Sequence, residues 1–179
     1  MSAVTPFPSE PRPILEVRQL SQTYKLARST LVGPRPTLKV LEGIDFSVKP
    51  GEAVGLVGES GSGKTTLTRM LTGVEKPMVG HVLYNGVDVW AGSAEERARF
   101  RRAVQVVLQN PRSSLDPRMR VGTSLLEPLR SLKIEGDHAA RVLEVLDQVG
   151  LQQSALERFP HEFSGGQLQR IAIARALMP

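Results

Sequence analysis

The sequence has 179 residues, of which 40% are hydrophobic and 23% are charged. These values are typical of a globular protein, and the length suits one ordinary domain with its own core rather than two. The chain contains no cysteine, which excludes disulfides, cysteine-ligated metal sites and a cysteine nucleophile. The net charge is +5, but the basic residues are spread over both halves, so they form no basic arm for nucleic acid.

The beginning of the chain is rich in proline. Residues 1–13 contain four prolines and no apolar run follows them, which predicts a flexible leader rather than a secretory signal. The longest apolar stretches, Ala53–Val57 and Ile171–Met178, fall well short of the roughly 20 residues that span a membrane. A role at a membrane would therefore need a partner protein.

The first hundred residues are predicted to combine strands and helices. The segments 53–57 and 103–108 are short and apolar throughout, as expected of parallel strands buried on both faces. Asn85-Gly86 is a strong signal for a hairpin turn. In chain order we expect a strand over 14–24, a loop over 26–37, a strand over 38–48, a turn over 49–52, a strand over 53–57, a helix over 65–71, a hairpin over 82–89, a helix over 94–102 and a strand over 103–108.

After Asn110-Pro111 the pattern becomes helical. Apolar residues recur at helical spacing over 121–132, 137–149 and 165–178. The sequence therefore predicts an α/β fold whose helical insert runs from about residue 112 to residue 162. In such folds ligands bind at the carboxyl ends of parallel strands, which is where the glycine-rich loop after Val57 is expected to lie.

That loop matches a phosphate-binding motif. Residues 58–65 read G-E-S-G-S-G-K-T and fit the pattern G-x-x-x-x-G-K-[ST]. Glycines let backbone N–H groups curl around phosphate oxygens, and a helix beginning near Thr65 directs the positive end of its dipole at them. Lys64 would neutralise the β- and γ-phosphates and Thr65 would bind Mg²⁺; a purely structural glycine turn is the alternative. The predicted site comprises Gly58, Glu59, Ser60, Gly61, Ser62, Gly63, Lys64, Thr65 and Thr66.

A second motif, F-S-G-G-Q at 163–167, opens the last predicted helix. Together with three other features, this motif makes the sequence resemble the ATP-binding cassette (ABC) family. These features are the phosphate loop, Gln109 at the start of the helical insert and Tyr24 ahead of the loop. The signature of that family is usually L-S-G-G-Q, so Phe163 is a departure that leaves the Ser-Gly-Gly-Gln part intact. A simple helix cap by Ser164 is the structural alternative, and capping is compatible with phosphate binding.

The resemblance implies a role for each of these residues. Tyr24 would stack on adenine, and Lys64 and Gln109 would act in catalysis, Gln109 also as a ligand of Mg²⁺ or water. The signature would contact ATP held by the phosphate loop of a second cassette, identical or different, so that two subunits pair head to tail. The signature residues expected to do so are Ser164, Gly165, Gly166 and Gln167.

Two stretches, 58–66 and 110–122, resemble the dipeptide, oligopeptide and nickel importer ATPases in particular. The resemblance implies an ATP-hydrolysing motor subunit on the cytoplasmic face of the membrane, held there by permease subunits that contact residues 111–121. Peptide is the first expected solute, with nickel and glutathione behind it. The alternative is a soluble ABC ATPase of phosphonate metabolism or DNA repair; the lack of cysteine counts against DNA repair, and no nucleic-acid partner is expected.

The resemblance covers residues 14–179 and implies a partial ATP-binding domain: a P-loop NTPase core with an N-terminal antiparallel β-subdomain and the helical subdomain as an insert. In the family, the segment that would follow Pro179 is the Walker B strand, with its Mg²⁺-anchoring Asp and the catalytic Glu, and after it the D-loop and the switch His. We therefore expect the sequence to be truncated before Walker B. The 179-residue chain is expected to hydrolyse ATP negligibly by itself and to leave an apolar edge open beside 53–57.

Overall fold

The computed structural model describes residues 12–27 and 35–179. Most of the predicted leader at 1–13 and most of the predicted loop at 26–37 lie outside the described residues. The chain divides into two compact units, Met1–Phe100 and Arg101–Pro179. Within the described ranges, no helix combines the length and the apolar character needed to cross a membrane.

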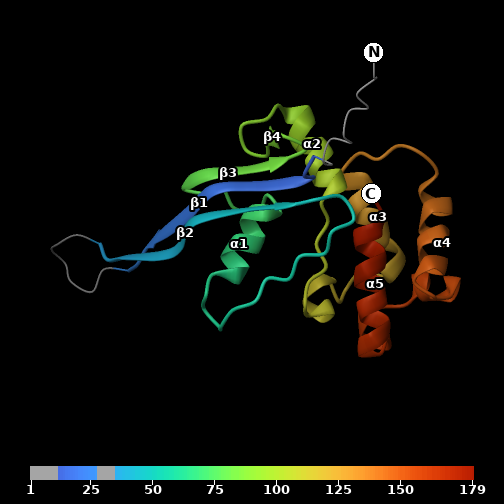
Figure 1. Ribbon diagram of the computed structural model, residues 1–179. Helices are drawn as coiled ribbons and strands as arrows, with labels where there is room; N and C mark the ends of the chain where they lie inside the picture. The colour runs from blue at the N-terminus through green and yellow to red at the C-terminus, as the bar shows by residue number, and fades with distance from the viewer. Residues whose placement is uncertain (1–11, 28–34) are drawn as a thin grey trace, which may run out of the picture. The chain divides into compact units, whose positions relative to one another are not determined.

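The first unit contains a four-stranded antiparallel sheet in the order β2-β1-β3-β4 (Figure 1). The turn between β3 and β4 places Asn85 and Gly86 at φ values of 48° and 81°, the two left-handed positions that an Asn-Gly hairpin turn favours. The predicted strands at 14–24 and 38–48 and the predicted hairpin are confirmed. The strands are β1 (Leu15–Lys25), β2 (Thr37–Val48), β3 (Val79–Tyr84) and β4 (Val87–Asp88).

Two helices accompany the sheet, α1 (Lys64–Leu71) and α2 (Ala94–Ala103), and both predicted helices are confirmed. Both helices and the strands contribute buried apolar side chains, and the Phe100 ring meets the Tyr84 ring edge to face at 5.6 Å between centroids. The buried apolar side chains of this unit are Val17, Leu20, Leu41, Leu67, Met70, Val82, Val89 and Phe100.

Asp88, at the end of β4, closes the turn toward α2. Its carboxylate accepts hydrogen bonds from the backbone N–H groups of Trp90 and Ala91 at 2.7 and 2.8 Å, and it lies 2.6 Å from His81 Nδ1. Burial opposes ionisation, but the hydrogen bonds from His81, Ala91 and Trp90 outweigh it, so the pKa of Asp88 falls below its ordinary value of 3.8. The charged form of Asp88 therefore stabilises this corner of the fold.

In the second unit the predicted helices at 121–132, 137–149 and 165–178 are confirmed as α3, α4 and α5 (Figure 1), and these helices supply most of the core. Asp137 caps α4 by accepting from the N–H groups of Ala139 and Ala140. Leu125, Val145 and Ile171 are fully buried between the helices. The helices are α3 (Val121–Ser131), α4 (His138–Gln148) and α5 (Gly165–Leu177), with 3₁₀ turns η1 (Pro111–Ser114), η2 (Gln153–Glu157) and η3 (Pro160–Glu162).

Two predicted strands are wrong. Ala53–Val57 has no regular structure, and of the segment Ala103–Leu108 the first residue ends α2 while the others are irregular. Val57 is 95% exposed, the opposite of what a buried strand requires. A parallel strand exists only through hydrogen bonds to a neighbour, and every strand in the described ranges pairs within the antiparallel sheet. The apolar pattern identified strand-like side chains but gave no information about a pairing partner.

Candidate nucleotide site

The phosphate loop begins after the irregular segment that ends at Val57 and leads directly into α1. Gly61 and Gly63 have φ values of 84° and 92°, a left-handed conformation that residues with a Cβ adopt only at a cost. The Ser62 N–H closes the loop by donating to the Glu59 carbonyl at 3.2 Å. The loop and the first turn of α1 enclose a pocket of about 260 Å³, lined by Val40, Ser60, Gly61, Gly63, Lys64, Thr65 and Thr66.

The electrostatics of this pocket favour an anion. Lys64 Nζ lies over the loop, where it donates to the carbonyls of Gly58 and Glu59, both at 2.6 Å. The first turn of α1 contains no acidic residue, and its N-cap, Gly63, supplies no side-chain cap. The positive end of the helix dipole is therefore uncompensated on the pocket side, and the residues present fit a phosphate group.

Of the hydroxyl groups that line the pocket, the motif assigns that of Thr65 to a magnesium ion. Thr65 is exposed and lines the pocket. Among residues 12–27 and 35–179, no group of three or more His, Asp or Glu side chains is arranged to hold a metal ion. Hard cations such as Mg²⁺ are bound by few protein oxygens together with substrate phosphates, so Thr65 fits an ion that arrives with a nucleotide.

One wall of the pocket comes from β2. A Cβ built on Gly63 would lie 2.9 Å from the Val40 carbonyl oxygen and 2.9 Å from Leu41 Cδ2. In the β1–β2 ladder, Gln22 pairs with Leu41 and Thr23 with Lys39, so Val40 is the extra residue of a β-bulge. The bulge places Val40 against the phosphate loop.

Tyr24 lies near the end of β1, in the same unit as the phosphate loop. It pairs with Leu38, which is two residues, or roughly 7 Å of strand, from the Val40 wall. The hydroxyl of Tyr24 donates to Glu75 Oε1 at 2.5 Å. Tyr24 and the pocket wall at Val40 thus lie on paired strands of one sheet, two residue positions apart.

The remaining predicted site residues lie in the second unit. Gln109 is exposed and immediately precedes Asn110, which caps η1 by accepting from the Arg112 N–H at 3.1 Å. Ser164 is the N-cap of α5 and forms a capping box with Gln167, so the capping alternative is confirmed.

The two glycines of the signature, Gly165 and Gly166, lie at the surface with free space around them. Both are exposed, and a Cβ on Gly165 or Gly166 would meet no atom within 4 Å. The Gln167 and Leu168 N–H groups bind the Ser164 hydroxyl and carbonyl. The N–H groups of Gly165 and Gly166 are thus the remaining donors of this described helix end. Neither packing nor a left-handed φ explains glycine at these positions.

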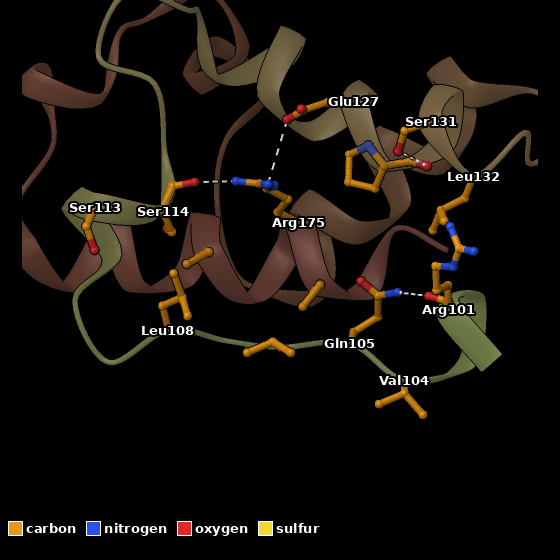
Figure 2. Close-up of a pocket in the computed structure, with 14 residues that line it drawn as sticks. Arg101, Val104, Gln105, Leu108, Ser113, Ser114, Glu127, Ser131, Leu132 and Arg175 are labelled. Carbon is orange, nitrogen blue, oxygen red and sulfur yellow. Dashed lines mark hydrogen bonds and ion pairs between the residues drawn. The ribbon is translucent and has the colours of Figure 1, made fainter. Parts of the chain in front are cut away.

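The sequence analysis did not identify two residues, Arg175 and Glu75, whose side chains hold together segments far apart in the sequence. Arg175, on α5, donates to the Ser114 carbonyl and lies 3.7 Å from a Glu127 carboxylate oxygen, at one side of a cavity of about 440 Å³ (Figure 2). A lone charge within the apolar stretch 171–178 is the signal that could have identified it. Glu75, which binds Tyr24, gives no such signal, because the two residues are 51 positions apart.

Solved structures show the same fold. The ATP-binding cassette MJ0796, in a dimeric post-hydrolysis state bound to ADP and Pi, matches with a TM-score of 0.73 and 27% identity, covering 92% of this chain and 69% of that one. CbiO1 from Clostridium perfringens, part of the ABC transporter complex CbiONQ, matches with a TM-score of 0.69 and 25% identity, covering 93% and 61%.

Curated relatives are more similar in sequence. A putative oligopeptide transport ATP-binding protein, YkfD of Bacillus subtilis, is 44% identical over 92% of this chain and 49% of its own length. The dipeptide transport ATP-binding protein DppF of Haemophilus influenzae is 40% identical over 94% of this chain and 52% of its own. The chain thus spans about half the length of the curated relatives it matches. Residues 41–179 match the family described as ABC transporter, and the chain belongs to that family.

Proposed function

We propose that this chain is the nucleotide-binding part of an ABC importer ATPase, that it binds ATP with Mg²⁺, and that the transported solutes are peptides. The observation that carries the ATP site is the phosphate loop itself: left-handed glycines, a lysine ammonium over the loop and an uncompensated helix N-terminus around one pocket. Family membership supports the same reading, and peptide as the solute rests on the names of the relatives YkfD and DppF.

The residues would share the chemistry as follows. The backbone N–H groups of the loop and the start of α1 hold the phosphates, and Lys64 neutralises charge on the γ-phosphate as it transfers. Thr65 supplies a hydroxyl to Mg²⁺, which, when bound, neutralises the phosphate oxygens and orients them. Gln109 positions water or the ion, and Tyr24 stacks on adenine. Lys64 Nζ, which binds the Gly58 and Glu59 carbonyls, would transfer these hydrogen bonds to phosphate oxygens.

Binding calorimetry tests the nucleotide site. Wild-type chain is expected to bind Mg²⁺–ATP, and Lys64→Ala is expected to weaken that binding by at least about tenfold, because it removes a charged hydrogen-bond donor from the phosphates. Lys76→Ala is the matched control, since Lys76 is an exposed lysine of the same unit that does not line the phosphate pocket. Equal ATP affinity in wild type and Lys64→Ala would refute the assignment.

The signature would act on a second subunit. The exposed N–H groups of Gly165 and Gly166 suit the γ-phosphate of ATP bound by a partner cassette. Gly165→Ala is expected to leave the unfolding midpoint of the chain unchanged, because nothing lies within 4 Å of the added Cβ, but to abolish ATP-dependent dimerisation in size-exclusion chromatography. A variant that still dimerises with ATP would contradict the role of this glycine.

The segment 111–121 is the proposed contact with a membrane partner. Residues 111–121 would contact a permease subunit and hold the chain at the cytoplasmic face of the membrane. Tagged protein purified from detergent-solubilised cells is expected to bring with it an integral membrane protein with several spans, and Ser113→Arg within η1 is expected to reduce its recovery. Recovery of soluble partners alone would contradict the importer assignment and leave the nucleotide site untouched.

A further inference from the structure

The hydroxyl of the proposed adenine-stacking residue is held by a carboxylate. Tyr24 Oη donates to Glu75 Oε1 at 2.5 Å, in a part-buried contact between β1 and the turn that follows α1. A phenol bound to a carboxylate is a charge-assisted hydrogen bond, which is stronger and more directional than a neutral one. The ring of Tyr24 is therefore fixed at its far end, by its hydroxyl.

Glu75 is itself fixed from two directions. Gln22 Nε2 donates to Glu75 Oε1 at 3.2 Å, and the Arg69 Nε lies 3.1 Å from Glu75 Oε2. Gln22 is only 8% exposed, and its carbonyl oxygen accepts from the Met78 N–H at 2.8 Å. The Glu75 side chain is 20% exposed, so this group is a half-buried carboxylate with three side-chain donors rather than a solvated surface charge.

The cluster joins the two halves of the proposed ATP site. Tyr24 and Gln22 stand two residues apart on β1 and both reach Glu75, so they share one face of the strand. Arg69 is on α1, the helix whose first residue is Lys64. Glu75 thus connects the aromatic ring with the helix that begins at the phosphate loop, because its carboxylate binds both the Tyr24 hydroxyl and the Arg69 side chain.

We propose that Glu75 is a positioning residue for the nucleotide base: it holds the Tyr24 ring at a fixed place relative to the phosphate loop, so that a purine stacks on it without the ring having to be ordered on binding. This proposal rests on the proposed ATP site. A ring ordered in advance loses less entropy when the base binds. Stacking uses the face of a base rather than its edge, so Glu75 affects purine nucleotides in general.

Calorimetry with three probes tests the proposal on the whole chain: Mg²⁺–ATP, Mg²⁺–GTP and inorganic tripolyphosphate. Glu75→Ala is expected to weaken ATP and GTP binding by about three- to tenfold, the size expected when one side chain has to be ordered on binding, and to leave tripolyphosphate binding unchanged. Tyr24→Phe, which keeps the ring and removes only the hydroxyl, is expected to do the same. The double variant is expected to be no weaker than either single variant, because both remove one contact.

Glu16→Ala is the matched control. Glu16 is a carboxylate on β1 with an arginine partner, Arg18, at 2.6 Å and an exposed fraction of 21%, close to that of Glu75; it is expected to change neither ATP nor tripolyphosphate binding. Glu75→Ala that binds ATP like wild type, or that loses ATP and tripolyphosphate equally, overturns the positioning role. Wild-type chain that binds none of the three probes overturns the proposed ATP site, and this proposal with it.

Discussion

Two glycines of the phosphate loop have similar φ angles but different surroundings. Substitutions at these positions can therefore distinguish backbone strain from steric overlap of an added Cβ. Gly61 and Gly63 have φ values of 84° and 92°. A Cβ on Gly61 would meet nothing within 4 Å, whereas one on Gly63 would lie 2.9 Å from both the Val40 carbonyl oxygen and Leu41 Cδ2. Alanine at each position therefore tests backbone strain with and without a steric overlap.

The expected magnitudes follow from these surroundings. A left-handed backbone costs a residue with a Cβ about 1–2 kcal/mol, which is the whole expected effect of Gly61→Ala. Gly63→Ala adds an overlap with a backbone oxygen that cannot rotate away, and overpacking of this kind costs about 1–3 kcal/mol more. We expect Gly63→Ala to lower the free energy of unfolding by about 2–5 kcal/mol in total.

Urea unfolding measures the difference. Trp90 is the single tryptophan of the chain and lies in the first unit, so its fluorescence reports on the unit that contains both glycines. The two variants are compared with each other as well as with wild type, because their difference removes the shared backbone term. Gly63→Ala that is as stable as Gly61→Ala would show that β2 does not press against the loop, and the described wall of the pocket would then be incorrect.

Two further predictions concern charged groups outside the phosphate loop. Because the pKa of Asp88 is lower in the folded chain than its ordinary value of 3.8, the stability it contributes is present above that value and is lost as the pH falls through the folded pKa. Asp88→Asn is expected to be less stable near neutral pH and to lose less stability on acidification, as measured by Trp90 fluorescence in urea; equal pH slopes would contradict this. Arg175→Met is expected to destabilise the second unit by about 1–3 kcal/mol through the lost bond to the Ser114 carbonyl, while Glu127→Gln costs at most about 1 kcal/mol because that carboxylate is half exposed. Thermal unfolding followed by helical circular dichroism compares the two, and equal losses would contradict the ranking.

Local patterns predicted the parts of the fold that local contacts determine. The Asn85-Gly86 turn needs two left-handed φ angles, which asparagine and glycine adopt readily. Helix α4 has apolar residues at helical spacing and Asp137 as its cap, and both features are visible in the sequence. The segment Ala53–Val57 had an equally clear pattern, but a parallel strand depends on a neighbour distant in sequence. The apolar pattern of a segment describes its side chains, whereas strand pairing depends on which other segment of the chain lies beside it.

The same division applies to the site. The spacing of glycine, lysine and threonine predicted the phosphate loop, because the chemistry of that loop is contained in consecutive residues. The wall formed by Val40 and the anchor formed by Glu75 bring together residues far apart in the chain. A single sequence carries no trace of such contacts, since valine in a strand and glutamate after a helix are ordinary in many folds.

The bulge at Val40 has a consequence for protein engineering. β2 carries one residue more than β1 at this point, since Gln22 and Thr23 are consecutive whereas their partners Leu41 and Lys39 are separated by Val40. Deleting Val40 would therefore restore a regular ladder with the same pairs, but it would remove the residue that forms the wall of the phosphate pocket. Variant libraries aimed at nucleotide preference should therefore change the size of residue 40 and keep the length of the strand constant.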